Sequence, residues 1–463
     1  MTGHYISTRG KAPRASFADV LLAGLAPDGG LYLPEVWPHL SAAEIDDLRR
    51  STDYIAVATD ILHRFAAGSF TREEIAADVA AAYAGFDDPA IVPRKTLAPG
   101  LHLLELFHGP TLAFKDLALQ VLGRLFARAL LRRGGKATVV VATSGDTGSA
   151  AIAALGGLPN IEVFVLHPLN RVSEVQRRQM TTAPHANIHN IALEGTFDDA
   201  QSLVKALFAD TDFASAVSLT AVNSINFARI AAQAVYYFTA SRTGGNTVFV
   251  VPTGNFGDVF AGEAAMRMGL PVEKLVIATN ANDILARALR DGIYARGDVH
   301  ASLSPSMDIQ VASNFERALF EASNRDATWL NGAMDGFARD GRLVIRPDVL
   351  AALRARYAAF ACDDALTVET MARVKRDFGE TIDPHTAVAF AAALSWWKPK
   401  EREVVILSTA HPAKFPDAVA KATGAPPPVP DRLKGLFDAA ERLEILPNDK
   451  ALVRAHISSK LGA

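Results

Sequence analysis

The sequence predicts an α/β fold built on mostly parallel sheets that are covered by helices. From about residue 93, short runs of β-branched and other apolar residues alternate with helical segments. Each run is apolar throughout, as expected of a strand buried on both faces, and strands that alternate with helices are typical of a parallel sheet. Residues 1 to about 92 follow a different pattern, which predicts a small N-terminal α+β domain.

The N-terminal unit, 1–92, opens with segments rich in glycine and proline. These segments, 9–13 and 28–34, indicate loops and short strands. Helical patterns follow at 41–50, 54–65 and 71–83. Thr71 precedes the last of these, and Glu73 and Glu74 lie in its first turn, as at a capped helix N-terminus.

The second unit, 93–430, contains the alternating elements. Strands are expected at 101–107, 138–142, 161–166, 187–193, 247–251, 275–278 and 403–407. Helices are expected at 117–132, from 148, from about 173, at 197–208 and at 259–268. The proline-rich segment 424–430 predicts a stiff linker, and we expect the charged tail that follows it, 431–463, to be helical.

The composition narrows the class of protein. The chain has 463 residues, of which 49% are hydrophobic and 21% charged, and this balance suits two or three globular domains. A net charge of -3 gives no basic footprint for nucleic acid or for an anionic membrane. The longest apolar stretch, 387–397, is much shorter than the roughly 20 residues of a membrane helix. The single cysteine, Cys362, and the absence of a signal-peptide pattern predict a cytoplasmic protein.

Lys115 is the first candidate for chemistry. It lies near the end of the segment ELFHGPTLAFKD, 105–116, between an expected strand and an expected helix. Desolvation among apolar neighbours lowers the pKa of a lysine, so that a free amine becomes available to condense with a carbonyl. The alternative is a surface lysine at the start of a helix, and this segment alone does not separate the two.

Three expected strands are each followed by an unusual loop. The loops are 143–148 (TSGDTG), 252–258 (PTGNFGD) and 408–415 (STAHPAKF). The carboxyl ends of parallel strands face a common crevice, where ligands bind. The first two loops place glycine and serine or threonine directly before a helix, whose unpaired N–H groups attract an anion. A glycine-rich turn that merely starts a helix is the commoner case, but two such loops together with Lys115 favour pyridoxal 5'-phosphate (PLP) and an anionic substrate.

Motifs of nucleotide-binding proteins, of serine hydrolases and of zinc sites are absent from the sequence or incomplete. No G-x-G-x-x-G follows an expected strand, and no G-x-S-x-G is present. Gly257 and Gly262 have the spacing of a P-loop, but Glu263 occupies the lysine position. His185 and His189 are four residues apart on an expected strand, where this spacing does not form a helical zinc pair, so we predict no metal site.

Several segments together resemble the threonine synthase family: 5–10, 24–34, 108–116, 143–148, 305–309 with 312–317, and 408–415. The resemblance runs from residue 5 to about 420 and includes the N-terminal unit, which related PLP enzymes lack. It implies a two-lobed PLP enzyme of fold type II. Ala113 departs from the serine of many relatives, but both residues are small and we expect little consequence.

The resemblance also implies roles for the cofactor residues. Lys115 would bind PLP as a Schiff base and act as the catalytic acid and base. Thr409 would hydrogen-bond the pyridine nitrogen, although from the residues alone it could equally bond local backbone. The cofactor phosphate would lie on the loop of Gly254, Asn255, Phe256, Gly257 and Asp258. The side chain of Asp258 is expected to cap the following helix.

Substrate residues are implied in the same way. The loop that receives the amino acid carboxylate would be Ser144, Gly145, Asp146, Thr147 and Gly148. Asn223 and Arg229 would reach a substrate phosphate, which an arginine can bind through two parallel hydrogen bonds. Phe227 stands where relatives often have proline, and the alternative is a helix-starting Asn223 with a solvent-exposed Arg229. Ser313 and Asn314 are expected in the crevice without an assigned role, and Asp116 is expected to be structural.

The implied reaction converts O-phospho-L-homoserine and water to L-threonine and phosphate, by γ-elimination followed by β-addition of water. The protein would act on this small molecule as a monomer or homodimer, without nucleic acid or membrane partners. One rival is a related PLP lyase, such as a threonine dehydratase or a phospholyase of O-phosphorylated amino acids. The other is a non-enzymatic relative that keeps the fold for binding, and an intact Lys115 argues against it.

Overall fold

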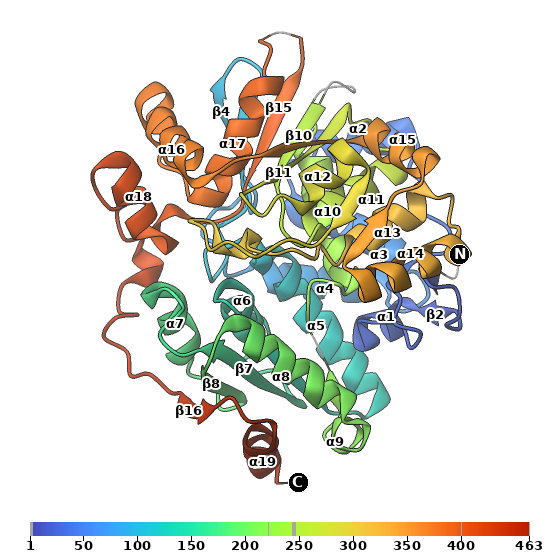
Figure 1. Cartoon of the computed structure of the whole chain (residues 1–463), viewed down its shortest axis with the longest axis vertical. Helices are drawn as coiled ribbons and strands as arrows, with labels where there is room; N and C mark the ends of the chain where they lie inside the picture. Colours follow the sequence, from blue (N-terminus) through green and yellow to red (C-terminus); the bar gives the residue numbers. More distant parts are fainter. Residues whose placement is uncertain (1–2, 221, 243–246, 400, 463) are drawn as a thin grey trace.

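Two lobes, each built on a largely parallel sheet, form the core of the protein (Figure 1). The structure is a computed structural model that describes residues 3–220, 222–242, 247–399 and 401–462. The fold is the expected α/β class. Within the described residues, no helix combines the length and the apolar character needed to cross a lipid bilayer.

The N-terminal unit packs on helix α10 (Phe227–Ala240) of the larger lobe. Its strands β1 (His4–Ser7), β2 (Ala15–Ser16) and β3 (Tyr32–Pro34) form an antiparallel sheet, and its helices are α1 (Phe17–Ala23), α2 (Ala42–Arg50), α3 (Tyr54–Phe65) and α4 (Arg72–Tyr83). The three helices expected here are confirmed, and Thr71 forms a capping box with Glu74. The ring of Tyr5 packs 5.2 Å from that of Phe227, which ties this unit to the lobe that it covers.

The larger lobe contains a sheet with the strand order β14-β11-β10-β15-β5-β4. Its strands are β4 (Arg94–Ala98), β5 (Leu101–Glu105), β10 (Thr247–Pro252), β11 (Lys274–Thr279), β14 (Tyr357–Ala361) and β15 (Glu403–Ser408). All neighbouring pairs are parallel except β4 with β5. Val248 and Val250 face the cluster of α17 (Pro384–Trp396), whereas Phe249 and Val251 face that of α10 and α11 (Gly257–Arg267). Burial on both faces explains why these strands are apolar throughout.

The smaller lobe is a parallel sheet with the order β16-β8-β7-β6-β9. It comprises β6 (Ala137–Ala142), β7 (Ile161–Pro168), β8 (Ile188–Glu194), β9 (Leu219–Thr220) and β16 (Glu444–Pro447). Its helices are α6 (Asp146–Leu155), α7 (Glu174–Thr181), α8 (Phe197–Ala209) and α9 (Thr211–Ala216). Helix α5 (Lys115–Arg133) packs against both α6 and α10 and thereby joins the two lobes.

The sequence predicts a helical C-terminal tail, but the tail also contains a strand. After the 3₁₀ turn η3 (Asp431–Leu433) it contributes β16 to the edge of the smaller sheet, next to β8, and then α19 (Lys450–Leu461). Figure 1 shows it passing from α18 (Pro416–Thr423) down to the smaller lobe. Pairing with β8, rather than a local apolar run, produces this strand.

The remaining elements lie in the larger lobe. They are α12 (Ile284–Asp291), β12 (Ile293–Ala295), η1 (Pro305–Met307), α13 (Phe315–Ala322), α14 (Ala327–Asp340), β13 (Arg342–Val344), α15 (Pro347–Arg356), α16 (Asp364–Phe378) and η2 (Pro412–Lys414). Two of them, η1 and η2, lie beside the site described next.

Candidate active site

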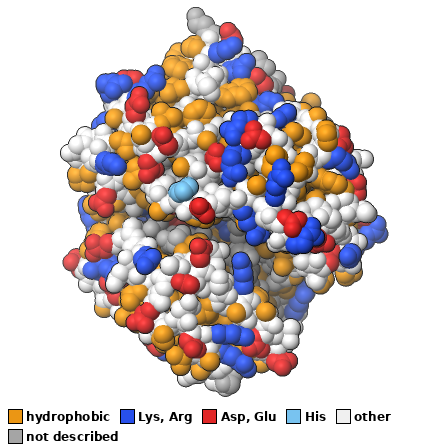
Figure 2. All heavy atoms as spheres, viewed as in Figure 1, with side chains coloured by type: hydrophobic (Ala, Val, Ile, Leu, Met, Phe, Trp, Pro, Cys, Tyr) orange, Lys and Arg blue, Asp and Glu red, His pale blue; other side chains and the backbone are white. Residues whose placement is uncertain are grey.

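A cleft of about 480 Å³ separates the lobes, and the surface is hollowed there in Figure 2. Its walls come from the end of β6 and the start of α6 on one side and from the segment around η1 on the other. A smaller inner pocket adjoins it, and Lys115, Asn255 and Ser306 line both cavities. The carboxyl ends of the strands therefore meet at one site, as the loop pattern predicts.

Lys115 is the first residue of α5 and is buried, with only 6% of its surface exposed. The alternative of a surface lysine is therefore wrong. The turn before it is pinned to the loop after β15, because the Phe114 N–H donates to the Thr409 carbonyl at 2.8 Å and the His411 N–H to the Leu112 carbonyl at 3.0 Å. Burial lowers the pKa of the Lys115 ammonium, and the nearby carboxylate of Asp146 opposes that shift.

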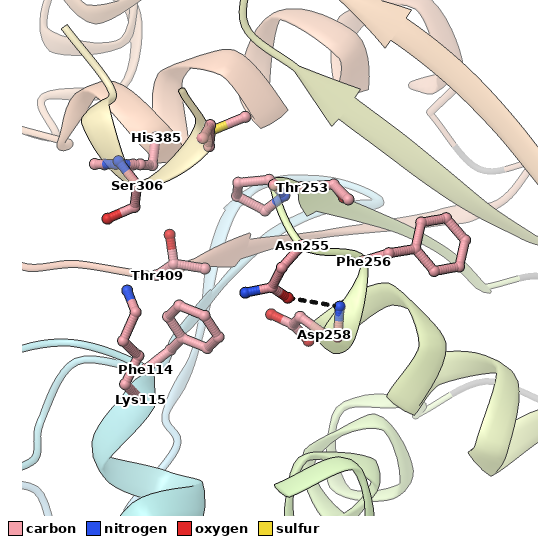
Figure 3. Close-up of a pocket in the computed structure, with 13 residues that line it drawn as sticks. Phe114, Lys115, Thr253, Asn255, Phe256, Asp258, Ser306, His385 and Thr409 are labelled. Carbon is pink, nitrogen blue, oxygen red and sulfur yellow. Dashed lines mark hydrogen bonds between the residues drawn. The ribbon is translucent and has the colours of Figure 1, made fainter. Parts of the chain in front are cut away.

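The inner pocket brings together all the residues expected to hold the cofactor. Its wall contains Lys115, Thr409 and the loop of Gly254, Asn255, Phe256, Gly257 and Asp258 (Figure 3). Asn255 Oδ1 accepts from the Gly257 N–H at 2.8 Å, which closes the loop. Phe256 has a positive φ of 67° and turns its ring outward onto Phe315, so it offers only its backbone to the pocket.

This loop fits a phosphate group. A Cβ added at Gly254 would lie 2.8 Å from the Ser306 carbonyl oxygen, and one at Gly257 would lie 2.8 Å from Asn255 Oδ1. Glycine at these positions keeps the backbone close to the pocket, and α11 begins at Gly257 on the pocket wall, where the N–H groups of its first turn lack partners within the helix. The buried amine of Lys115 lies across the pocket, so the residues present suit PLP.

Asp258 does not cap the helix, contrary to expectation. The cap position belongs to Phe256, and the Asp258 carboxylate instead accepts hydrogen bonds from the hydroxyls of Tyr236 and Tyr237. Burial raises its pKa to about 6, and the tyrosine hydroxyls act against this rise. The tyrosines belong to α10, far from Asp258 in the sequence, so no local sequence pattern predicts their contact with Asp258.

The expected carboxylate loop forms the start of α6, which begins at Asp146, two residues earlier than predicted. Thr143 Oγ1 accepts from the Gly145 and Gly148 N–H groups, both at 2.9 Å, and Gly145 has a φ of 136°. The side chain of Asp146 turns inward, with Oδ2 3.3 Å from Lys115 Nζ. Ser144 and Thr147 line the cleft.

The two residues expected to hold a substrate phosphate lie in different surroundings. Asn223 lines the cleft, whereas Arg229 is buried within α10 and only 3% exposed, so the alternative of a solvent-exposed Arg229 is wrong. Its Nε and Nη1 have no hydrogen-bond partner among the described residues. Burial lowers its pKa to about 10. Two buried guanidinium nitrogens without a hydrogen-bond partner are costly to the fold, and an anion would supply the acceptors that they lack.

Three further expectations concern neighbouring residues. Ser313 lines the cleft, and Asn314 is buried behind it, where its Nδ2 donates to the Ser224 carbonyl at 3.1 Å and to that of Asn255 at 3.2 Å. Asp116 accepts from the Thr111 N–H at 2.7 Å and from its hydroxyl at 2.8 Å. Burial raises its pKa to about 6 although these bonds lower it. Asp116 thus holds the turn before Lys115.

Sequence reasoning assigned no role to some residues of the site. His385 lines the inner pocket; its Nδ1 lies 2.8 Å from Asp383 Oδ1, and its Nε2 accepts from the Ser306 N–H at 3.3 Å. Lys414 is fully buried, with its Nζ 2.7 Å from Asp146 Oδ1. Lys414 lies in the segment 408–415 that the sequence had singled out, but its partner lies in another loop.

Comparisons with known proteins agree with one another. Family profiles match in sequence order: "Threonine synthase N terminus" over 4–83, "Pyridoxal-phosphate dependent enzyme" over 92–409 and "Threonine synthase, C-terminal" over 386–457. A curated threonine synthase of Pseudomonas aeruginosa is 48% identical over 98% of each chain. The solved structure of PLP-bound threonine synthase from Brucella melitensis is 46% identical, with a TM-score of 0.96 over 100% of both chains. That of yeast threonine synthase is 36% identical, with a TM-score of 0.94 over 100% of this chain and 99% of the other.

Proposed function

The chain belongs to the threonine synthase family of PLP-dependent enzymes, and on that premise we propose that it converts O-phospho-L-homoserine and water to L-threonine and inorganic phosphate. The observation that carries the proposal is the pairing of two cavities. The inner pocket combines a buried amine with a glycine loop. The adjoining cleft is lined by Ser144, Thr147 and Asn223, which suit an anionic amino acid.

PLP supplies an electron sink that stabilises negative charge on carbon next to the amino group. Lys115 would hold the cofactor covalently, the loop 254–258 would receive its phosphate, and Thr409 would accept or donate a hydrogen bond at the ring nitrogen. Lys115 and Thr409 line the same pocket, because the Phe114 N–H donates to the Thr409 carbonyl and so joins their two loops; this supports assigning both residues to the cofactor.

Proton transfer is the proposed task of Lys115. Its Nζ would remove the proton from the substrate α carbon and then assist removal of a proton from the β carbon. Phosphate would leave from the γ carbon, and a proton would then add to that carbon, which becomes the methyl group of threonine. Water would add its hydroxyl group to the β carbon, and Lys115 would return a proton to the α carbon. Burial supports this role, because a lowered pKa leaves more of the lysine as the free amine that can accept a proton.

Substrate binding would use two anion sites. Backbone N–H groups at the start of α6 would receive the amino acid carboxylate. Asn223 and Arg229 would receive the substrate phosphate. The unpartnered Nε and Nη1 of Arg229 support the second assignment, since a phosphate oxygen would complete their hydrogen bonding.

The remaining expectations are also proposals. We place the enzyme in the cytoplasm as a monomer or homodimer. We divide it into the N-terminal unit 1–92, the PLP-binding core 93–430 and the tail 431–463. The lone cysteine, Cys362, supports a reducing compartment, because a single thiol cannot form an intrachain disulfide.

A product assay tests the proposal. The purified chain is loaded with PLP, supplied with O-phospho-L-homoserine, and assayed for threonine, phosphate and 2-oxobutyrate. We expect threonine and phosphate in equal amounts. 2-Oxobutyrate as the main product would reassign the chain to the related lyases. A protein that develops no visible absorption band with PLP would instead support a non-enzymatic binding role.

A further inference from the structure

Lys414 is a second buried lysine at the site. It ends the short turn η2, five residues after Thr409, and its side chain is fully buried. Its Nζ lies 2.7 Å from Asp146 Oδ1 and donates to the Thr111 carbonyl at 2.8 Å. The ion pair therefore connects the loop after β15 in the larger lobe to the first residue of α6 in the smaller lobe.

Two lysines thus share one carboxylate, and they share it unequally. Asp146 Oδ1 receives Lys414 at 2.7 Å and the side-chain amide of Gln176 at 2.8 Å. Asp146 Oδ2 receives Lys115 at 3.3 Å and the hydroxyl of Ser306 at 3.2 Å. The shorter contacts all fall on the oxygen that faces Lys414, so Lys115 is the more loosely held partner.

The chemistry of Lys115 requires that this partnership can be broken. To bind PLP, the neutral amine of Lys115 must attack the aldehyde carbon, after which a C=N bond forms and one water leaves. If Lys115 were the sole cation beside Asp146, loss of its proton would leave a buried carboxylate without a counter-ion. Removing one partner of a buried ion pair is strongly unfavourable, so the proton would be held on Lys115.

We propose that Lys414 is a positioning residue that serves as the permanent counter-ion of Asp146 and so frees the amine of Lys115 to lose its proton and bind the cofactor. This inference rests on the role of Lys115 in the proposed function. It assigns Lys414 no contact with the cofactor or the substrate. It also explains why a carboxylate can stand in a loop that is expected to receive an anion: Lys414 already neutralises it.

Among the described residues, Lys414 is the one cation besides Lys115 that forms an ion pair with Asp146. The groups that face Lys115 from the packed elements are Asp146 on α6, Lys414 on η2, Arg229 on α10, Asp258 on α11, His385 on α17 and the adjacent Asp116. Burial is the largest influence on the pKa of Lys115 and lowers it; Asp146 raises it, and the charges of Lys414 and Arg229 lower it further. Loss of Lys414 should therefore raise the pKa of Lys115.

The test measures cofactor capture instead of turnover. The full-length chain is freed of PLP, PLP is added, and the growth rate of the visible band is followed as a function of pH. We expect Lys414→Met to move the midpoint of this profile upward by about one pH unit or more, because an unopposed carboxylate shifts a neighbouring pKa by that amount. Lys414→Arg keeps the charge and should stay near the wild type. Lys421→Met, an exposed lysine on α18, is the matched control and should not shift the profile.

Several results would overturn the proposal. One is a folded Lys414→Met protein, with the thermal midpoint of the wild type, that captures PLP with an unshifted profile. Another is a Lys414→Arg protein as impaired as Lys414→Met, since charge would then not be the cause. If Lys414→Met does not fold, the double variant Asp146→Asn with Lys414→Met removes both charges, and the proposal predicts that it captures PLP at a pH no higher than the wild type needs.

A Lys115→Ala variant separates the two levels of the account. If it forms the same lysine-type absorption band with PLP as the wild type, the assignment of Lys115 under the proposed function fails. If it forms none, while Lys414→Met behaves as the wild type, only the role of Lys414 fails.

Discussion

The backbone N–H of Phe114 donates to the carbonyl of Thr409 at 2.8 Å. This one bond joins the turn before α5 to the loop after β15, and it brings Lys115 and Thr409 to the same pocket. An isolated bridge between Ala113 and Ala410 continues the pairing. Residues from distant parts of the chain are thus held in one pocket by hydrogen bonds between backbone groups.

Replacing Arg229 should stabilise the fold and weaken the activity. Replacing it with methionine removes a buried guanidinium whose Nε and Nη1 have no partner among the described residues. We expect the free energy of unfolding to rise by about 1–3 kcal/mol, measured by denaturant titration without substrate. We also expect kcat/KM for O-phospho-L-homoserine to fall by about 100-fold or more, with the PLP absorption band unchanged.

Arg229→Lys should recover only part of the activity, because lysine lacks the two-pronged donor. A variant with full activity would remove Arg229 from the phosphate site.

Gly254 should be needed for cofactor affinity. A Cβ at this position would meet the Ser306 carbonyl at 2.8 Å, and a backbone atom cannot rotate away. Overpacking of this size costs about 1–3 kcal/mol, so Gly254→Ala should weaken PLP binding by about tenfold or more in an equilibrium titration. Gly332→Ala is the control, since nothing lies within 4 Å of a Cβ there and the site is helical. Equal PLP affinity in the two variants would contradict the assignment of the loop 254–258 to the cofactor phosphate.

Asp258 should make stability depend on pH. Burial raises its pKa from an ordinary 3.8 to about 6. The protonated form therefore contributes stability that is complete below about pH 4 and is lost as the pH rises through about 6. Asp258→Asn keeps an uncharged acceptor for Tyr237 at every pH. We expect the variant to match the wild type near about pH 4 and to exceed its unfolding free energy by about 3 kcal/mol near about pH 8. The exposed Asp335→Asn should show no such difference, and parallel pH curves for wild type and Asp258→Asn would refute the prediction.

Helix α19 should stabilise the smaller lobe. Val453 is fully buried in the cluster that also contains Phe164 and Leu207, whereas its neighbour Leu452 is 49% exposed. Val453→Asp would bury an unpaired charge and should lower the unfolding free energy by about 3 kcal/mol or more. Leu452→Asp should change it by no more than about 0.5 kcal/mol. Chemical denaturation of the two variants provides the comparison; similar losses would mean that the tail does not pack as described.

The sequence predicts those parts of the fold whose causes are local. Strands such as β10 are recognisable because burial on both faces requires an unbroken apolar run, and α4 because Thr71 caps it. Strand β16 has no such signal: it is short and mostly exposed, and it forms because it pairs with β8. The prediction of a helical tail therefore did not include β16.

The site divides in the same way. The loops after β6, β10 and β15 could be predicted to converge, because the ends of parallel strands share an edge. The pairing of Lys414 with Asp146 could not, since nothing near either residue in the sequence indicates the other. The same holds for Asp258, where Tyr236 and Tyr237 override the local expectation of a helix cap.

Isotope transfer from water tests the central claim most directly. The PLP-loaded chain is incubated with O-phospho-L-homoserine in oxygen-18-labelled water, and both products are analysed by mass spectrometry. Addition of water at the β carbon predicts one oxygen-18 atom in the hydroxyl group of threonine and none in the phosphate, because phosphate leaves by cleavage of the bond to the γ carbon. Label in the released phosphate, with unlabelled homoserine as its partner product, would show simple hydrolysis at phosphorus and would contradict the account.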